Sequence, residues 1–452
     1  MKHQTTGSKA ENYEAPFLMT PSARISAIID LLGQIEQPGT HANKTISKYF
    51  RNRRYIGSKD RRAISDSIFN ILRHHARLLW WTNDGIARLR TIASLVLLDR
   101  KSQQEVIDLF NGDGYAPPSL TPSELKLLKS CMGKSVDDPS MPLWLSSEVP
   151  EWLLNEMQAN WPLDLIEETN ALNQPAPIDI RVNTLKASRD NALMLLNNDG
   201  IKAKPTPFSP IGLRIHGRVN LQITTAFKGG FIELQDEGSQ LISFLVDAKM
   251  GQKTVDFCAG GGGKTLALAA LMNDGGPLIA CDVNSFRLNK MHKRLKRAGV
   301  TNVTPNLLAG LSDPWIEKTE ASAHRVLLDT PCSGSGSWRR SPANKWQLTR
   351  EKLKKNIERQ TKIINTASKL VKPGGRLIYS TCSVLRGENE EQIERFLKEN
   401  RNFDVFPIPQ LWNSVLDGNC PTTGPYLNLT PARHSTDGFC VPVVEFNRGV
   451  EC

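Results

Sequence analysis

Long hydrophobic runs are missing from this sequence. Its longest apolar stretches, residues 92–98 and 266–272, are far shorter than the ~20 residues that a helix needs to cross a bilayer. The first seventeen residues are polar and lack the charged-then-apolar pattern of a secretory signal. We therefore expect a cytoplasmic protein that does not bind membranes.

Cysteine is scarce and irregularly spaced. The chain has 8 cysteines in 452 residues, none of them in a Cys-x-x-Cys arrangement and none at zinc-finger spacing from the 8 histidines. So few cysteines in a long chain argue against a disulfide framework, and their spacing argues against a structural zinc site. We expect no metal.

Acidic residues are outnumbered by basic ones. Asp and Glu total 46 against 57 Lys and Arg, which gives a formal net charge of +11. Excess positive charge favours a polyanionic partner, although a merely basic protein explains this balance equally well. With 39% hydrophobic residues the chain is too apolar for whole-chain disorder, and its length predicts about three domains.

The first quarter of the chain lacks strand-like alternation. Apolar residues recur there at helical spacing over residues 23–35, 63–79 and 86–98. We predict a flexible N-terminus over residues 1–18, followed by an all-helical domain over residues 19–112.

Strand patterns begin only further along the chain. Residues 113–142 contain five prolines and predict a linker with one short helix near residues 124–131. Strands at 178–182 and 212–216 surround a helix at 188–196, which predicts a small α/β module over residues 143–245.

From residue 246 to the C-terminus, strand and helix alternate. This pattern predicts an α/β, Rossmann-like domain over residues 246–452, with a doubly wound parallel sheet and right-handed crossovers. Such sheets bind ligands at the carboxyl ends of their strands. The predicted strands are 254–257, 278–281, 325–328 and 376–380, and the helices are 264–272, 286–298 and 350–371.

A basic segment lies inside the helical domain. Eight cations fall within nineteen residues that contain Asp60 as their one acid, with Tyr49, Phe50 and Tyr55 interleaved. Such a segment can hold phosphates while its rings stack on bases, but a solvated helical face with core tyrosines explains it equally well. The cations are Lys44, Lys48, Arg51, Arg53, Arg54, Lys59, Arg61 and Arg62.

A glycine-rich loop follows the first strand of the last domain. A nucleoside-triphosphate loop would need glycine at position 258, and a dinucleotide motif would need it at position 265; the chain has Cys258 and Thr265 there. Glycines without a Cβ still let the main chain approach a ligand closely. The loop runs through Cys258, Ala259, Gly260, Gly261, Gly262, Gly263 and Lys264.

S-adenosylmethionine is the remaining ligand for a strand–loop–helix of this kind. Its ribose hydroxyls require an acid at the end of the next strand, and Asp282 stands there. Capping of the following helix is the plainer role for this residue.

Two cysteines follow the ends of two predicted strands. Cys332 lies in Asp329-Thr330-Pro331-Cys332, and Cys382 lies in Thr381-Cys382-Ser383. Carbon-5 of a pyrimidine is a poor nucleophile, but a thiolate added at carbon-6 converts the ring into an enamine that can attack a methyl sulfonium. The motifs favour this covalent chemistry over two buried core cysteines, with Asp329 placed to hold a protonated contact on the ring.

At these residues the chain resembles the Sun-type (RsmB-like) RNA 5-methylcytosine methyltransferases. The resemblance covers most of the chain, and the two cysteine motifs are its most specific part. It also includes the glycine loop, Arg181-Val182-Asn183-Thr184-Leu185-Lys186, Gln235-Asp236-Glu237-Gly238-Ser239-Gln240, Arg339-Arg340-Ser341-Pro342 with Lys345-Trp346, Glu388-Asn389-Glu390 and Asp437-Gly438-Phe439.

The resemblance implies roles for these residues. Cys382 would be the nucleophile and Cys332 the thiol that assists release, while Asp282, Asp329 and the glycine loop would hold S-adenosylmethionine. The helical domain would be a NusB-like RNA-binding module and residues 143–245 an RNA-contacting extension. The substrate would be RNA, which we expect to be ribosomal RNA or a precursor of a ribosomal subunit. Implied RNA contacts outside the basic segment are Arg181, Asn183, Arg339, Arg340 and Lys345.

Two departures from the family pattern keep alternatives open. Gly260-Gly261 replace the usual Ala-Pro, and residues 307–311 lack the acid expected after the third strand, with Asp313 as its nearest substitute. A second hypothesis is therefore an RNA-binding ribosome-assembly factor with weak or lost turnover. A third, methylation of an exocyclic amine, would leave Cys382 dispensable.

Overall fold

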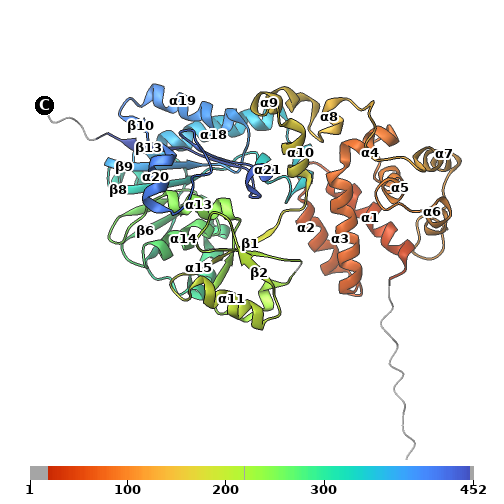
Figure 1. Ribbon diagram of the computed structural model, residues 1–452, viewed down its shortest axis with the longest axis horizontal. Coiled ribbons are helices and arrows are strands. Elements are labelled where there is room, and N and C mark those ends of the chain that lie inside the picture. The colour runs from red at the N-terminus through yellow and green to blue at the C-terminus, as the bar shows by residue number, and fades with distance from the viewer. Residues whose placement is uncertain (1–18, 218, 448–452) are drawn as a thin grey trace, which may run out of the picture. The chain divides into compact units, whose positions relative to one another are not determined.

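A computed structural model (Figure 1) describes residues 19–217 and 219–447. The chain forms two compact units, and the boundary between them lies between Glu148 and Val149. Within the described residues, no helix combines the length and apolarity that crossing a bilayer requires.

The first unit is helical throughout its described part. The predicted start of α1 is confirmed, because the Thr20 hydroxyl accepts a hydrogen bond from the amide of Ala23 at 3.2 Å and Pro21 follows. The helix predicted over 63–79 is two helices that break at His74. The elements are α1 (Pro21–Ile35), α2 (Ala42–Asn52), α3 (Ser58–Arg73), α4 (His75–Thr82), α5 (Ala87–Leu97), α6 (Gln103–Leu109), α7 (Pro122–Cys131) and α8 (Leu143–Ser146).

The segment 113–142 differs from the expected linker, because it packs within the first unit. Glu124 of α7 completes a capping box with Thr121 and pairs with Arg88 of α5 at 2.6 Å. Leu128 and Cys131 are fully buried. The short helix predicted near residues 124–131 is confirmed as α7, but the prolines were wrongly taken to indicate a linker. Pro122 occupies the start of that helix, where its missing N–H leaves no bond unmade.

In the second unit, a four-stranded antiparallel sheet has the order β2-β3-β1-β4. Apolar side chains of β1 and β3 pack against α11, as the alternation in the sequence predicts. The elements before and around it are η1 (Glu151–Leu153), α9 (Leu154–Asn160), α10 (Leu165–Asn173), β1 (Ile178–Val182), α11 (Arg189–Asn198), β2 (Ala203–Pro205), β3 (Gly212–Ile215), η2 (Leu221–Ile223), α12 (Thr225–Lys228) and β4 (Ile232–Leu234).

The larger sheet has seven strands in the order β10-β13-β9-β8-β5-β6-β7. Strands β5 to β9 are parallel, while β13 and β10 are antiparallel additions. The strands are β5 (Thr254–Asp256), β6 (Leu278–Asp282), β7 (Val303–Leu307), β8 (Ala323–Asp329), β9 (Val371–Ser380), β10 (Phe403–Val405) and β13 (Val443–Phe446). Strands β5, β6 and β7 follow one another toward one edge of the sheet, and the chain then returns so that β8 lies on the other side of β5. That reversal creates a switch point between β5 and β8.

Helices cover both faces of this sheet (Figure 1). One apolar cluster joins the sheet to α13 (Glu237–Leu245), α14 (Gly263–Leu271), α15 (Ser285–Ala298) and α20 (Ile408–Val415). Another joins it to α16 (Pro314–Lys318), α18 (Arg350–Ser368) and α19 (Glu390–Glu399). The remaining elements are η3 (Ser335–Ser337), α17 (Pro342–Gln347), η4 (Arg386–Glu388), β11 (Leu427–Leu429), α21 (Pro431–His434) and β12 (Phe439–Val441). The Rossmann-like fold class is thus confirmed.

The strand β9 begins earlier than predicted. The sequence predicted a helix to residue 371 and a strand from 376, but α18 ends at Ser368 and β9 starts at Val371. Pairing with β8 draws the Pro-Gly-Gly segment into the strand, with a register irregularity between Ala323 and Arg325. A partner strand outweighs the local preference of Pro and Gly for a turn.

Replacement of Leu128 by Ala tests whether α7 is part of the first unit. Loss of a fully buried leucine side chain should lower the free energy of unfolding by about 2–5 kcal/mol. Hydrogen exchange of the intact protein should show faster exchange in α5 and α7. Lys129→Ala on the exposed side of α7 is the control, and an unchanged exchange rate in Leu128→Ala would mean that α7 is not packed there.

Candidate active site

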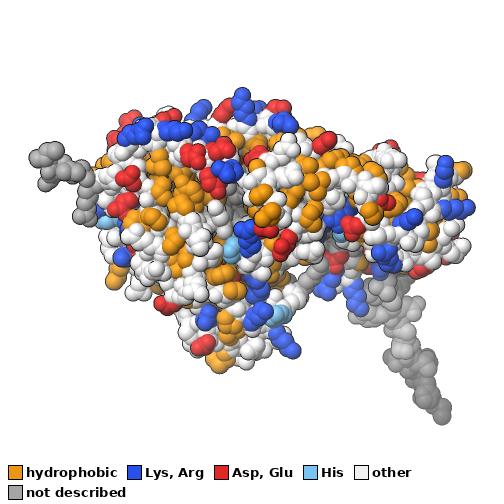
Figure 2. Space-filling view, turned by 45° about the horizontal axis from the view of Figure 1, so that its top comes forward, with side chains coloured by type: hydrophobic (Ala, Val, Ile, Leu, Met, Phe, Trp, Pro, Cys, Tyr) orange, Lys and Arg blue, Asp and Glu red, His pale blue; other side chains and the backbone are white. Residues whose placement is uncertain are grey.

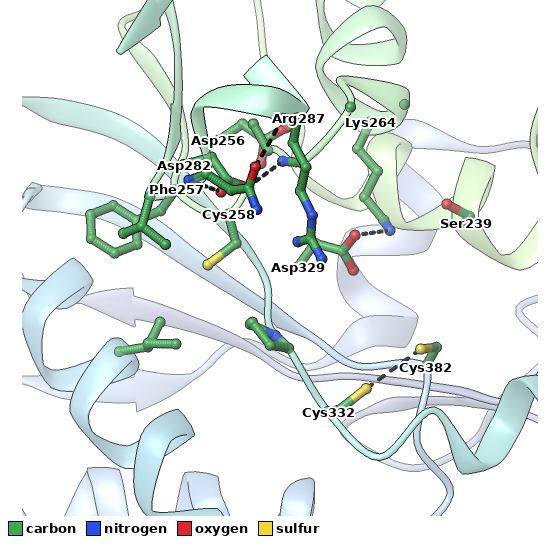
Figure 3. Close-up of a pocket in the computed structure, with 18 of the residues that line it drawn as sticks. Ser239, Asp256, Phe257, Cys258, Lys264, Asp282, Arg287, Asp329, Cys332 and Cys382 are labelled. Carbon is green, nitrogen blue, oxygen red and sulfur yellow. Dashed lines mark hydrogen bonds and ion pairs between the residues drawn. The ribbon is translucent and has the colours of Figure 1, made fainter. Parts of the chain in front are cut away.

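A cavity of about 860 Å³ opens at the carboxyl ends of β5, β6, β8 and β9, at the switch point of the sheet. Figure 3 shows the glycine-loop side chains on one wall and the two cysteines on another. The cavity therefore gathers every predicted catalytic residue and the predicted cofactor loop except Gly262, which does not line it. Its lining includes Cys258, Ala259, Gly260, Gly261, Gly263, Lys264, Asp282, Asp329, Cys332 and Cys382.

The glycine loop needs glycine most strictly at position 262. Gly262 has a φ of +81° and caps α14, and a Cβ there would lie 2.6 Å from Cγ of Met291. Gly260 also has a positive φ, of +57°, but a Cβ there would meet no atom within 4 Å. Arg294 of α15, which also lines the cavity, donates to the carbonyl of Gly261 at 2.7 Å. The loop is thus braced by α15 and open in front of Gly260.

Asp256 closes the base of the loop. Its carboxylate accepts a hydrogen bond from the Thr265 hydroxyl at 2.7 Å and so links the end of β5 to the start of α14. Burial raises the pKa of Asp256 to about 7.

Asp282 lies beside the loop, as predicted. One carboxylate oxygen accepts the Gly260 amide at 2.8 Å, and the other accepts the Asn284 amide at 2.7 Å. Asn284, rather than Asp282, caps α15 with its side chain. A carboxylate has about four acceptor positions, so Asp282 can still accept hydroxyl donors.

Asp313 does not replace the missing acid after β7. It caps α16 and accepts the amides of Ala309 and Trp315, and it does not line the cavity. The wall at this edge is instead formed by Leu308, Gly310 and Leu311.

Lys264 and Asp329 form an ion pair at the centre of the cavity, with 2.7 Å between Nζ and Oδ2 (Figure 3). Lys264 is 8% exposed, so the pair is poorly screened on the lysine side. The hydroxyl of Ser380 also approaches Asp329, at 3.4 Å. The sequence predicted that both residues lie at the site, but it did not predict the contact between them.

Parallel pairing of β8 with β9 brings the two cysteines together. Asp329 pairs with Ser380, so each strand ends at the same level and its cysteine follows within three residues. The two sulfur atoms, of Cys332 and Cys382, are 3.4 Å apart (Figure 3). Both side chains are partly exposed and line the cavity.

The two thiols are electrostatically unequal. The hydrogen bond between the two thiols lowers the pKa of Cys382. Lys264 also lowers it, whereas burial and Asp329 raise it. The pKa of Cys332 is raised well above its ordinary value by that same hydrogen bond, by burial and by Glu388. Cys382 is therefore the thiol that ionises first.

Four residues expected to contact RNA are buried instead. Burial lowers the pKa of Arg181 to about 10, and the Asn183 amide donates to the carbonyls of Gly230 and Ala298. Arg339 pairs with Asp437 at 2.5 Å, and Lys345 donates to Asn173 at 2.6 Å. The expectation is corrected for these four, because they are at most 4% exposed.

The side chain of Arg340 remains partly exposed to solvent. Its side chain is 36% exposed although it pairs with Asp236 and Asp437. It stays a predicted RNA contact.

The basic segment of the first unit is mostly exposed. Lys44, Lys48, Arg51, Arg54, Lys59 and Arg62 are exposed, and Arg53 and Arg61 are half-buried. Asp60 is buried and pairs with Arg24 of α1 at 2.7 Å, outside the segment. Tyr49 and Phe50 are buried, so Tyr55, 72% exposed, is the ring of the three that is available for stacking.

Sequence reasoning missed the basic residues around the cavity. Arg287 and Arg294 of α15 and Arg359 of α18 line it. Figure 2 shows Lys and Arg side chains along the edge that α18 and α19 occupy in Figure 1. The basic helix predicted over residues 286–298 was the one signal in the sequence that could have located the two arginines of α15. Over residues 19–217 and 219–447, no group of three or more His, Cys, Asp or Glu is arranged to hold a metal ion.

Comparisons with known proteins agree with this geometry. A family model described as 16S rRNA methyltransferase RsmB/F matches residues 243–444, and one described as an RsmF/B-like ferredoxin-like domain matches residues 149–222. A probable ribosomal RNA small subunit methyltransferase B of Synechocystis sp. is 31% identical over 313 residues, which are 68% of this chain and 69% of that protein.

Two further comparisons extend this result. The ribosomal RNA small subunit methyltransferase B of Photorhabdus laumondii is 34% identical over 251 residues, 56% of this chain and 58% of that one, which is less than two thirds of its length. The crystal structure of PH0851 has a TM-score of 0.75 and 28% identity, and the match covers 95% of this chain and 99% of that one.

The parallel sheet and the loop at its switch point define a class I methyltransferase, for which S-adenosylmethionine is the cofactor. The chain belongs to the RsmB/F family of 16S rRNA methyltransferases. Its residues fit the cofactor, because the loop is open in front of Gly260 and Asp282 keeps free acceptor positions beside it.

Replacement of Gly262 by Ala should weaken cofactor binding. The left-handed conformation costs about 1–2 kcal/mol for a residue with a Cβ, and the clash with Met291 adds to this, so the affinity should fall about tenfold or more. Calorimetry with S-adenosylhomocysteine measures the change.

Gly418→Ala is the control for backbone strain outside the cavity. Its φ is +86° and an added Cβ would meet no atom within 4 Å, so cofactor binding should stay close to that of the unaltered protein. Equal losses in the two variants would contradict the special role of Gly262.

Proposed function

We propose that this protein methylates carbon-5 of cytosine in ribosomal RNA through a transient bond between the sulfur of Cys382 and carbon-6 of the base. The observation that carries this proposal is the pair of thiols 3.4 Å apart on a cavity that also holds the cofactor loop. The named activity of the relatives supports ribosomal RNA as the substrate.

The asymmetry of the thiols supports Cys382 as the nucleophile. The contact with Cys332 lowers the pKa of Cys382, and the nearby Lys264 also favours a thiolate there. When the thiolate adds to carbon-6, its electron pair forms the carbon–sulfur bond and the ring electrons move to carbon-5. S-adenosylmethionine, when bound, supplies the methyl group that carbon-5 takes.

Release needs a second proton transfer. The proton on carbon-5 must pass to a base, and the electrons of that carbon–hydrogen bond then restore the ring double bond and expel the Cys382 thiolate from carbon-6. The base we propose is the sulfur of Cys332, 3.4 Å from that of Cys382, which must be a thiolate at this step and becomes a thiol when it takes the proton. We infer that Asp329, held by Lys264, contacts the ring, and that the Lys264 cation offsets the negative charge that builds there.

The competing hypothesis of an assembly factor without turnover makes a different prediction about the loop. It was motivated by Gly260-Gly261 and the missing acid, which would impair cofactor binding. The open, braced loop and the acceptor positions of Asp282 favour an enzyme instead. Calorimetry that found RNA binding but no S-adenosylhomocysteine binding would favour the assembly factor.

Replacement of Cys332 by Ala should trap the covalent intermediate. Because release is slowed while attack by Cys382 continues, a protein–RNA adduct should survive denaturing electrophoresis after incubation with RNA and S-adenosylmethionine. The adduct should be absent from the Cys332→Ala, Cys382→Ala double variant. Cys420→Ala, which removes a half-buried thiol outside the cavity, is the control and should accumulate none. Methylated product from Cys382→Ala alone would exclude the mechanism and favour methylation of an exocyclic amine.

We also propose that the first unit is a NusB-like RNA-binding module and that its basic segment contacts the phosphate backbone. The exposed cations support this role, because Asp60, the acid within the segment, is buried against Arg24 and leaves their charge uncompensated locally. Phosphate contacts raise affinity for RNA of any sequence and make it sensitive to salt.

Charge reversal of Arg51 and Arg54 should weaken RNA binding. Both are exposed and lie on one hollow of the surface of the first unit. Fluorescence anisotropy at several salt concentrations should show weaker binding, with a salt slope smaller by about one for each phosphate that the variant no longer neutralises. Lys126→Glu with Lys129→Glu on α7 is the matched control for net charge, and an equal loss of affinity there would refute a localised site.

A further inference from the structure

Two consecutive buried residues after the Cys382 loop, Glu388 and Asn389, have no role in the mechanism above. Both lie at the end of η4 and are at most 2% exposed. Each makes side-chain hydrogen bonds to residues that flank one of the two cysteines.

Asn389 holds both neighbours of Cys382. Its side-chain oxygen accepts a hydrogen bond from the Thr381 hydroxyl at 2.5 Å, and its amide donates to the carbonyl of Ser383 at 2.9 Å. The residues on either side of the cysteine are therefore tied to one side chain.

Glu388 holds Cys332 from the other loop. Its carboxylate accepts the amide of Ser333 at 2.9 Å and the Ser333 hydroxyl at 2.5 Å. Gln360 of α18 donates to Glu388 and to the carbonyl of Pro331, both at 3.0 Å. Pro331 and Ser333, the two neighbours of Cys332, are thus held by one connected pair of side chains.

The burial of Glu388 is costly without a compensating cation. Its side-chain partners are Ser333 and Gln360, both uncharged, and among the described residues no lysine or arginine pairs with it. A buried charge of this kind is unfavourable unless its hydrogen bonds are geometrically good. The main chain of Glu388 is itself fixed, because the Tyr379 hydroxyl of β9 donates to its carbonyl at 2.7 Å.

We propose that Glu388 and Asn389 are paired positioning residues, each of which holds the residues that flank one catalytic cysteine, so that together they set the separation of the two thiols. The inference rests on the proposed function for its meaning, but the separation itself can be tested without RNA. Neither residue touches the reacting atoms.

The negative charge of Glu388 has a second consequence. Cys332 is faced by Cys382 and Tyr379 from β9 and its following loop, and by Glu388 from η4; Glu388 also faces Glu156 of α9. Lys264 and Asp329 act on Cys382. Glu388 is therefore a carboxylate that favours the protonated form of Cys332.

The separation is tested by the rate at which diamide oxidises the two thiols to a disulfide in the full-length protein, followed by peptide mapping. Thr381→Val removes the bond that Thr381 donates to Asn389, together with the one that its hydroxyl accepts from the Ser383 amide, with almost no change in shape. Glu388→Ala releases the Cys332 loop. Each should slow formation of the Cys332–Cys382 disulfide about tenfold or more. Glu391→Ala, which removes an exposed carboxylate on the adjoining helix, should not. An unchanged rate in Thr381→Val, which should remain folded, would overturn the proposal.

Glu388→Gln separates charge from geometry. The glutamine retains an oxygen for Ser333 and Gln360 but carries no charge, so disulfide formation at a pH where both thiols ionise should stay close to normal. In the pH dependence of alkylation by iodoacetamide, the ionisation of Cys332 should move to lower pH, because a carboxylate that raises the pKa of this thiol is gone. A profile identical to that of the unaltered protein would show that the charge has no such role.

These measurements distinguish this inference from the proposed function. If Thr381→Val slows disulfide formation but Cys332→Ala yields no RNA adduct, the positioning role stands and the catalytic proposal fails. If the adduct forms and the disulfide rate is unchanged in Thr381→Val, the catalytic proposal stands and the positioning role fails.

Discussion

The parallel pairing of β8 with β9 is the constraint on which the rest of the site depends. It joins Asp329 to Ser380 across two strands that lie about fifty residues apart in the chain. Because side chains alternate between the faces of a sheet, a shift of one residue would point Asp329 and the start of each cysteine loop to the opposite side. The register therefore fixes the ion pair with Lys264 and the 3.4 Å approach of the two sulfur atoms together.

Charges on either side of that strand pair give the two thiols different chemistry. Lys264 lies toward Cys382, whereas Glu388 lies behind Cys332. The same lysine holds Asp329, so one cation next to the glycine loop joins that loop to the end of β8. For the reaction that we propose, such an arrangement would need little motion, because the charges are already fixed in the cavity.

Burial explains why several family motifs were misread as RNA contacts. Arg339 and Arg340 are neighbours in the sequence, yet Arg339 is enclosed by Asp437 and Asp236 while Arg340 keeps an exposed part. The sequence of an arginine-rich motif does not show whether its arginines contact a phosphate or an aspartate about a hundred positions away. Partners so distant in sequence leave no local pattern, and the same is true of Glu388 with Ser333.

The sequence by itself determined the Rossmann-like class, the strands that carry the site, the glycine loop and the identity of both cysteines. These features follow from local rules: hydrophobic periodicity, the backbone freedom of glycine and the position of a loop at the end of a strand. Tertiary structure alone decided that the two sulfur atoms meet, which thiol ionises first and which cations remain exposed. Those outcomes depend on how close segments far apart in the chain come and on how deeply they bury each other's side chains. Strand pairing brings such segments together only when the protein folds.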